Sequence, residues 1–335
     1  MERSVKKRVA AYMAGMTIAA LLAAVLSVFF GSTDISWNDV VQALVSPDPS
    51  KHEHLTILEL RVPRTIGDLL VGACLACAGA IMQGVSRNPL ADCGILGINA
   101  GASFALAVCL GVFSTMNFGM SVLASGMGAL VAGLLVFGAM LLSRRKFDPG
   151  RLVLAGLAVS MFFTSLAQAV SLFTNTGHDL AFWSAGGTAG IRMEQLKIAA
   201  PLMVATLVWS VLLAKKVALL SLGPEAAQGL GLHVNGAYAQ CLGAVLIVAA
   251  CATALAGPVA FAGLLVPYVA RRFVGQSYEK VIPASIVTGA CFMTLADLIS
   301  RLVNAPSETP VGLIFALLGV PVFIYIARKG GAGLE

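Results

Sequence analysis

The chain has 335 residues, of which 58% are hydrophobic and only 11% are charged, and its mean hydropathy is +0.89. This composition excludes an ordinary soluble domain and predicts a polytopic membrane protein. The formal net charge of +6 could suggest a nucleic-acid partner. The basic residues, however, cluster between apolar runs and form no basic stripe of the kind that binds nucleic acid.

Since a membrane-crossing helix needs roughly 20 residues, a chain of this length favours a single all-α transmembrane domain over residues 1–335. Ten apolar runs are predicted to form helices near 9–30, 62–84, 95–113, 118–143, 152–173, 193–214, 238–257, 259–274, 281–302 and 309–327. The first run follows a basic start, as in a signal peptide, but it continues to about Phe30 without a convincing cleavage site. We therefore expect a retained helix.

The positions of the basic residues predict the orientation of these helices. If the N-terminus is inside, the outer Lys and Arg residues are Lys51, Arg61, Arg64, Arg192, Lys197 and Arg301. The other sixteen of the 22, among them Arg144, Arg145 and Lys146, then lie inside. The positive-inside rule thus places both termini in the cytoplasm.

Two polar segments are long enough to carry structure of their own. The outer loop, about 31–60, predicts a short helix capped near Ser36 and then an irregular stretch. The inner loop, about 215–237, predicts a short helix that starts at Pro224. Its end is expected at Gly229 or Gly231. The sequence contains no GxxxxGK[ST] phosphate-binding loop, so any ATPase must be a separate chain.

Several motifs share one order along the chain. They are RVPRT, GAIMQGVSRNPLAD and GILGINAGA within 61–104, followed by GPVAFAGLLVPYVARRFVG, PASIVTGACFMTLADLISR and PSETPVGLIFALLGVPVFIYIARK. Together they resemble the permease family of bacterial importers for ferric siderophores, haem and cobalamin. Cys93, where members commonly have Pro, and Tyr268, where many have His, depart from that pattern.

The resemblance implies a type II ABC importer permease architecture in a bacterial plasma or inner membrane. It also implies a dimer of two permease subunits that works with two ATPase subunits and an extracytoplasmic solute-binding protein. No cofactor, resident metal or catalytic residue is expected, because neither a Ser-His-Asp set nor an H-E-x-x-H pattern is present. The chain is therefore expected to be a transport subunit and not an enzyme.

The inner loop carries a pattern similar to the coupling loop of ABC importer permeases. The matching residues, with the preceding glycine, are Gly223, Glu225, Ala226, Ala227 and Gly231. A short rigid helix there could insert into an ATPase and transmit its closure. The alternative is a merely solvated loop.

Arg61 and Arg301 lie at the predicted outer ends of two helices. Arginines at helix ends often extend their side chains only to place the charged group in the polar region of the membrane surface. Exposed guanidinium groups would also suit carboxylates of a docking partner, and in the resembling family both positions contact the solute-binding protein. We therefore expect an exposed docking pair.

Asp68 and Asp297 are the ionisable residues predicted deepest in the membrane. Such residues suggest a functional site by default, as in a proton-coupled carrier. However, each lies four residues from an arginine, Arg64 and Arg301 respectively, and can pair with it along its own helix. Asp68 also departs from the resembling family, in which an apolar or small residue is expected.

The run near 152–173 carries one polar stripe, formed by Ser160, Thr164, Gln168 and Ser171. Ser and Thr can bond to their own helix, so packing between helices is one interpretation. A stripe that contains a glutamine also suits a water-filled path. In the resembling family this helix borders the translocation pathway at the dimer interface.

Cys74 and Cys77 form a C-x-x-C pair, but they lie in an apolar run without a second pair, so small-residue packing is the interpretation. His52 and His54 are too few for a metal site and are expected in a solvated loop.

The sequence thus predicts an importer permease for a metal chelate, with ferric siderophore first and haem or cobalamin as alternatives. An ion-coupled secondary transporter remains the rival from another class.

Overall fold

The computed structural model describes residues 2–113, 118–142, 148–305 and 307–331, and these contain helices and no strand. Ten helices correspond one by one to the ten predicted runs. They are α1 (Glu2–Phe29), α4 (Val62–Ser86), α5 (Ile98–Val112), α6 (Phe118–Leu142), α7 (Pro149–Thr174), α9 (Met193–Ser221), α11 (Val234–Ala256), α12 (Ala262–Val274), α13 (Tyr278–Leu302) and α14 (Val311–Gly331). Shorter elements connect them: α2 (Trp37–Val45), α3 (His52–Leu55), η1 (Thr56–Arg61), η2 (Cys93–Leu96), α8 (Gly177–Ser184) and α10 (Pro224–Gly229).

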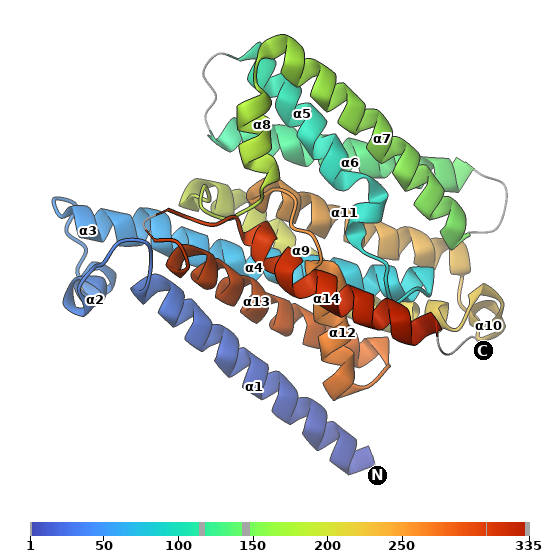
Figure 1. Ribbon diagram of the computed structural model, residues 1–335. Coiled ribbons are helices and arrows are strands. Elements are labelled where there is room, and N and C mark those ends of the chain that lie inside the picture. Colours follow the sequence, from blue (N-terminus) through green and yellow to red (C-terminus); the bar gives the residue numbers. More distant parts are fainter. Residues whose placement is uncertain (1, 114–117, 143–147, 306, 332–335) are drawn as a thin grey trace.

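Among the described helices, seven are long and apolar enough to cross a membrane: α1, α4, α6, α7, α9, α11 and α13. The helix α4 forms the centre of the bundle, where it packs against α9, α11, α12 and α13. α5, α6 and α7 form a group beside this centre, and α1 packs on the outside of α13 (Figure 1).

Glycines allow the central helices to approach closely. A Cβ atom added to Gly72 of α4 would collide with the carbonyl of Gly289 on α13, and the reverse substitution would collide with the carbonyl of Gly72. Gly101 of α5 and Gly128 of α6 have the same reciprocal relationship. Small residues at helix crossings are typical of membrane proteins, in which van der Waals packing replaces the hydrophobic drive between helices.

The chain before α4 differs from the prediction. Ser36 caps α2 as expected, accepting a hydrogen bond from the Asp39 N–H. The following stretch, however, is helical through α3 and the π-helical η1, so that one continuous helix runs over 52–86. The obstacle in the sequence is Pro63, which cannot donate to the preceding turn. The π-helical turn before it accommodates the missing donor.

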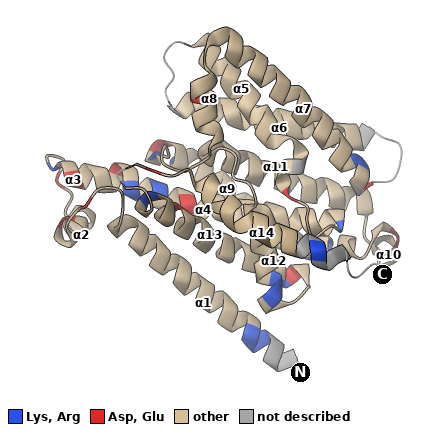
Figure 2. Cartoon of the chain, in the orientation of Figure 1, with Lys and Arg blue, Asp and Glu red and all other residues tan. Residues whose placement is uncertain are grey.

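The described ends of α1 and α14 point to the same side of the bundle as α10, whereas α2 and α3 lie on the opposite side (Figure 1). Charged residues lie mainly near these two ends of the helices (Figure 2). Arg144, Arg145 and Lys146 lie outside the described residues. The cytoplasmic location of both termini stays a prediction.

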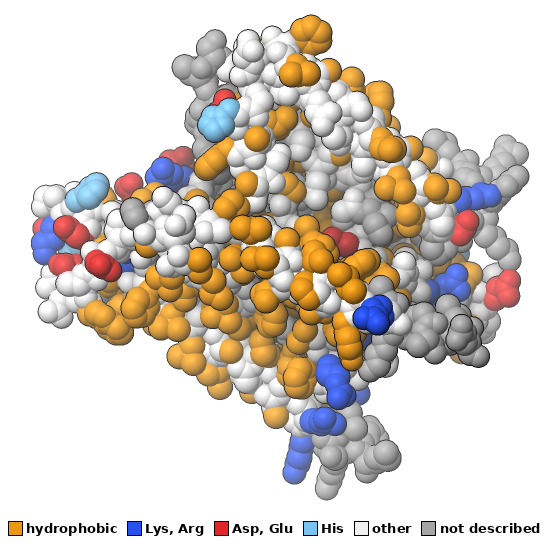
Figure 3. Space-filling view, in the orientation of Figure 1, with side chains coloured by type: hydrophobic (Ala, Val, Ile, Leu, Met, Phe, Trp, Pro, Cys, Tyr) orange, Lys and Arg blue, Asp and Glu red, His pale blue; other side chains and the backbone are white. Residues whose placement is uncertain are grey.

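A broad apolar surface covers the bundle between its charged ends (Figure 3). Large side chains such as Leu21 of α1 and Leu317 of α14 are 61% and 64% exposed. A continuous apolar surface of this kind fits contact with lipid or a second membrane protein, not water. The chain is a multi-pass membrane protein.

Candidate functional site

A buried ionic cluster joins α4, α13 and the loop that follows α13. The Arg64 guanidinium donates to Asp297, with an Nη2–Oδ1 distance of 2.7 Å, and to Glu308, with an Nη1–Oε1 distance of 2.8 Å. Asp297 is fully buried and also pairs with Arg301, at 2.9 Å between Nη2 and Oδ2. The predicted pair of Asp297 and Arg301 along α13 is therefore confirmed. Buried carboxylates need such partners, since an unpaired charge would be strongly destabilising.

The predicted pair of Asp68 with Arg64 is wrong. Arg64 instead donates to Asp297 of α13 and to Glu308 of the loop that follows α13. The fully buried Asp68 instead accepts a hydrogen bond of 2.6 Å from the hydroxyl of Thr188, between α8 and α9. That hydroxyl also lies 3.2 Å from Asp297 Oδ1, so Thr188 links the two buried carboxyl groups.

Arg61 and Arg301 are buried, at 5% and 2% exposure, so the expectation of exposed guanidinium groups is wrong. Arg61 donates to the carbonyls of Val28 and Phe29, at 3.0 and 2.8 Å, and Arg301 donates to the carbonyl of Ser27, at 3.1 Å. These carbonyls end α1 and have no helical donor of their own. Cations there also complement the helix dipole. The two arginines therefore fasten α1 to α4 and α13, and docking stays a prediction.

The four residues of the predicted stripe on α7 have different environments. Thr164 and Gln168 are exposed, and Ser160 is half-buried. Ser171 is buried and donates to the carbonyl of Gln168 at 3.0 Å, as the packing interpretation expected. Only the middle of the stripe thus faces away from the rest of the chain, where a second subunit or an aqueous path could lie.

The inner loop folds as predicted into a short helix. Gly223 precedes α10 with a φ of +108°, Pro224 occupies the first turn, and the helix ends at Gly229. Gly231 then turns the chain with a φ of +83°, a conformation that suits glycine. Both flanking glycines of the motif therefore serve the backbone that turns into and out of α10.

The two faces of α10 differ. Ala227 is fully buried against the bundle, whereas Glu225 and Ala226 are exposed. Leu222 and Leu230 flank the helix and are each 63% exposed. Glu225 thus lies between two exposed leucines on a side of α10 that the described chain leaves uncovered, and its coupling role stays a prediction.

The turn after α4 lies next to this inner loop. Arg87 ends α4 in the left-handed conformation, close to Gly223. Asp92 accepts a hydrogen bond of 2.8 Å from the Cys93 N–H, a bond that proline at this position could not donate. Burial raises the pKa of the Asp92 carboxyl, although the bond from Cys93 opposes that shift. The departure from the family pattern at Cys93 thus has a local structural consequence.

Other polar residues of the sequence serve packing. Cys74 and Cys77 are fully buried among apolar side chains. The expectation of a solvated His54 is wrong, because it is 2% exposed and its Nδ1 accepts a hydrogen bond from the Asp48 N–H at 3.1 Å. Within the described ranges, no three His, Cys, Asp or Glu side chains are grouped so as to hold a metal ion.

Comparisons with known proteins agree with this architecture. The model of the FecCD transport family matches residues 19–329. The iron(3+)-hydroxamate import permease FhuB of Bacillus subtilis is 39% identical over 93% of this chain and 82% of its own length. The ferric enterobactin permease FepD of Escherichia coli is 34% identical over 95% of this chain and 96% of its own. An inward-facing metal-chelate type ABC transporter, solved as a structure, has a TM-score of 0.82 and 25% identity, covering 95% and 98% of the two chains.

The all-helical bundle, with seven described helices that could cross a membrane and the fold of a metal-chelate type ABC transporter, has the architecture of a membrane permease. The match over nearly the whole sequence then places it: the chain belongs to the FecCD transport family. It is a permease subunit of an ABC import system and not an enzyme. Family membership also removes the ion-coupled secondary transporter as the rival interpretation.

Proposed function

We propose that this permease carries a ferric siderophore across a bacterial cell membrane, driven by two ATPase subunits and supplied by an extracytoplasmic binding protein. The observation that carries the proposal is similarity over more than nine-tenths of the chain to permeases of iron(3+)-hydroxamate and iron-uptake systems. An iron(3+)-citrate permease of Bacillus subtilis is similar at 38% identity. Haem and cobalamin are the alternative cargoes.

The inner end of the permease supports coupling to an ATPase. The exposed side of α10 presents Glu225 between Leu222 and Leu230. Its opposite side is anchored through the buried Ala227. A movement imposed on this helix would therefore be transmitted to α9 and α11, against which α10 packs. Such a movement can shift the balance between two packed states of the bundle.

The exposed part of α7 supports a cargo path between two permease subunits. Thr164 and Gln168 lie there on a surface that this chain does not cover. A second subunit that placed its own α7 opposite would enclose these polar groups between the two copies. Since closed assemblies of related subunits are usually symmetric, each subunit would supply one wall of the path.

The outer end supports docking of the binding protein less directly. Arg61 and Arg301 fasten α1 in this conformation, so a docking partner would meet them only if its acidic groups replace the α1 carbonyls as acceptors. Glu308, 33% exposed in its side chain and paired with Arg64, lies closer to the surface. We retain the two arginines as proposed docking residues on the basis of the family resemblance.

Cargo identity can be tested by uptake into vesicles that contain the permease, its cognate ATPase and its binding protein. A radiolabelled ferric hydroxamate siderophore should accumulate, and excess unlabelled siderophore should suppress that accumulation. Excess haem or cobalamin should leave it unchanged. Accumulation of labelled haem or cobalamin in place of the siderophore would overturn the assignment of cargo while leaving the permease assignment intact.

A further inference from the structure

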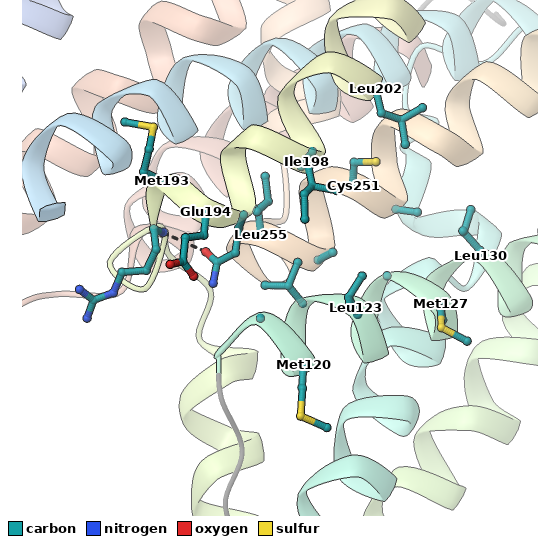
Figure 4. Close-up of a pocket in the computed structure, with 18 of the residues that line it drawn as sticks. Met120, Leu123, Met127, Leu130, Met193, Glu194, Ile198, Leu202, Cys251 and Leu255 are labelled. Carbon is teal, nitrogen blue, oxygen red and sulfur yellow. Dashed lines mark hydrogen bonds between the residues drawn. The ribbon is translucent and has the colours of Figure 1, made fainter.

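A cleft of about 1050 Å³ opens on the side of the bundle between α6 and α9, with α11 as its floor. Leu123 and Leu130 of α6 line one side, Ile198 and Leu202 of α9 line the other, and Leu255 of α11 lies between them (Figure 4). We propose that this cleft binds one phospholipid with a zwitterionic aminoalcohol headgroup, such as phosphatidylethanolamine, from the outer leaflet.

The length of the cleft matches one leaflet. Its lining on α6 extends from Gly119 to Leu130, which at 1.5 Å per residue is roughly 16 Å. The hydrocarbon core of a bilayer is about 30 Å thick, so one leaflet contributes about 15 Å. An acyl chain that entered at the outer end would therefore reach the end of the cleft near the middle of the membrane.

The walls are apolar along this depth and polar only at one end. Leu123 and Ile198 are 61% and 74% exposed, so the cleft offers apolar surface that the chain itself leaves uncovered. A polar rim is formed by Glu59, which precedes α4, and by Arg192 and Glu194 at the start of α9. Glu59 lies in η1, which directly follows α3 and packs against α2, so this end of the cleft is the end of the bundle that carries α2 and α3. An amphipathic occupant with its headgroup outside fits this arrangement.

The charges of the rim favour a zwitterionic headgroup. One guanidinium and two carboxylates are exposed there, and none of the three forms a salt bridge within the described part of the chain. Arg192 can donate to a phosphate, as guanidinium groups do well. Glu59 and Glu194 can accept from the ammonium group. An anionic headgroup without an ammonium would leave both carboxylates facing like charge.

The experiment is native mass spectrometry of the purified permease complex after exchange into nanodiscs with equal amounts of phosphatidylethanolamine and phosphatidylglycerol. We expect retention of one phosphatidylethanolamine per copy. Leu123→Trp should fill the cleft and remove this lipid. The matched control is Leu134→Trp, which lies three turns further on the same side of α6, is 55% exposed and does not line the cleft.

A second pair of variants tests the rim without changing the cleft. Arg192→Gln removes a charged hydrogen bond, so retention of phosphatidylethanolamine should fall roughly tenfold. Lys197→Gln removes another exposed positive charge, from the first turns of α9, that does not line the cleft, and should have no effect.

Equal retention of both lipids, or equal effects within each pair of variants, would mean ordinary lipid contact and overturn the proposal. Separation of the permease subunits by Leu123→Trp alone would show instead that the cleft faces another subunit.

Discussion

Arg64 of α4 and Asp297 of α13 form a buried ion pair, with both Nε and Nη2 of the arginine within 3.1 Å of the carboxylate. The two residues are 233 positions apart in the sequence. Their helices also cross at Gly72 and Gly289. The most extensive helix contact among the described helices is thus fixed by close packing along the helices and by charge near the end of the bundle that carries α2 and α3.

Asp297→Asn should destabilise the permease by roughly 3 kcal/mol, because it leaves two buried guanidinium groups without their shared carboxylate. The thermal midpoint of the detergent-solubilised protein measures this effect. Asp148→Asn is the control, since the pair of Asp148 with Arg151 is exposed and long, at 3.8 Å. Asparagine can still cap α7 there. Equal midpoints for the two variants would contradict the role given to Asp297.

Gly72→Ala should prevent close approach of α4 and α13 and reduce the yield of monodisperse protein. Gly138→Ala on α6 provides the comparison, because nothing lies within 4 Å of the added methyl group. Alanine at such a helical position is favourable by about 0.5–1 kcal/mol. If size-exclusion profiles of both variants matched the native protein, the crossing would not depend on glycine.

Gln168→Cys should react with a water-soluble maleimide, because the proposed path on α7 contains water and thiolates form only where water can solvate them. Leu212→Cys on α9 is 73% exposed to the outside of the bundle and should stay unlabelled in the lipid. Labelling of the native chain gives the background from its seven cysteines. The prediction fails if both variants label equally or neither labels.

Arg61→Lys should lower the thermal midpoint, because one ammonium cannot replace both Nη1, which donates to the carbonyls of Val28 and Phe29, and Nη2, which donates to the carbonyl of Thr33. If the charge of Arg61 also attracts the binding protein, docking affinity should survive in Arg61→Lys and fall in Arg61→Gln. Surface-immobilised permease complex and purified binding protein provide the measurement. Unchanged docking in a folded Arg61→Gln protein would leave Arg61 with its structural role alone.

Much of the fold could be predicted because membrane helices are recognised by the length of their apolar runs. The short helix α10 is recognised by Pro224 at its start and by the glycines that flank it. The start of the helix before Pro63 could not, because proline normally indicates a helix boundary and a π-helical turn has no comparable signal. Local spacing correctly paired Asp297 with Arg301.

The rest of the ionic cluster depends on contacts between distant segments. The i, i+4 rule describes one helix in isolation, so it paired Asp68 with Arg64 when a hydroxyl 120 positions away was the partner. Glu308 follows Arg301 closely in the sequence, but its bond to Arg64 requires the α4–α13 crossing. The guanidinium groups of Arg61 and Arg301 are likewise buried because they donate to backbone carbonyls at the end of α1. Backbone carbonyls are the same in every residue, so the sequence could not indicate these partners.

The central claim is that an ATPase drives transport through α10. ATP-dependent uptake of radiolabelled ferric siderophore into vesicles with the complete complex tests it most directly, with Glu225→Arg compared with Glu279→Arg, another exposed acid that lies outside α10. The account predicts uptake only with ATP, loss of that uptake in Glu225→Arg, and native uptake in Glu279→Arg. Uptake that proceeds without ATP, or that Glu225→Arg leaves unchanged, would contradict it.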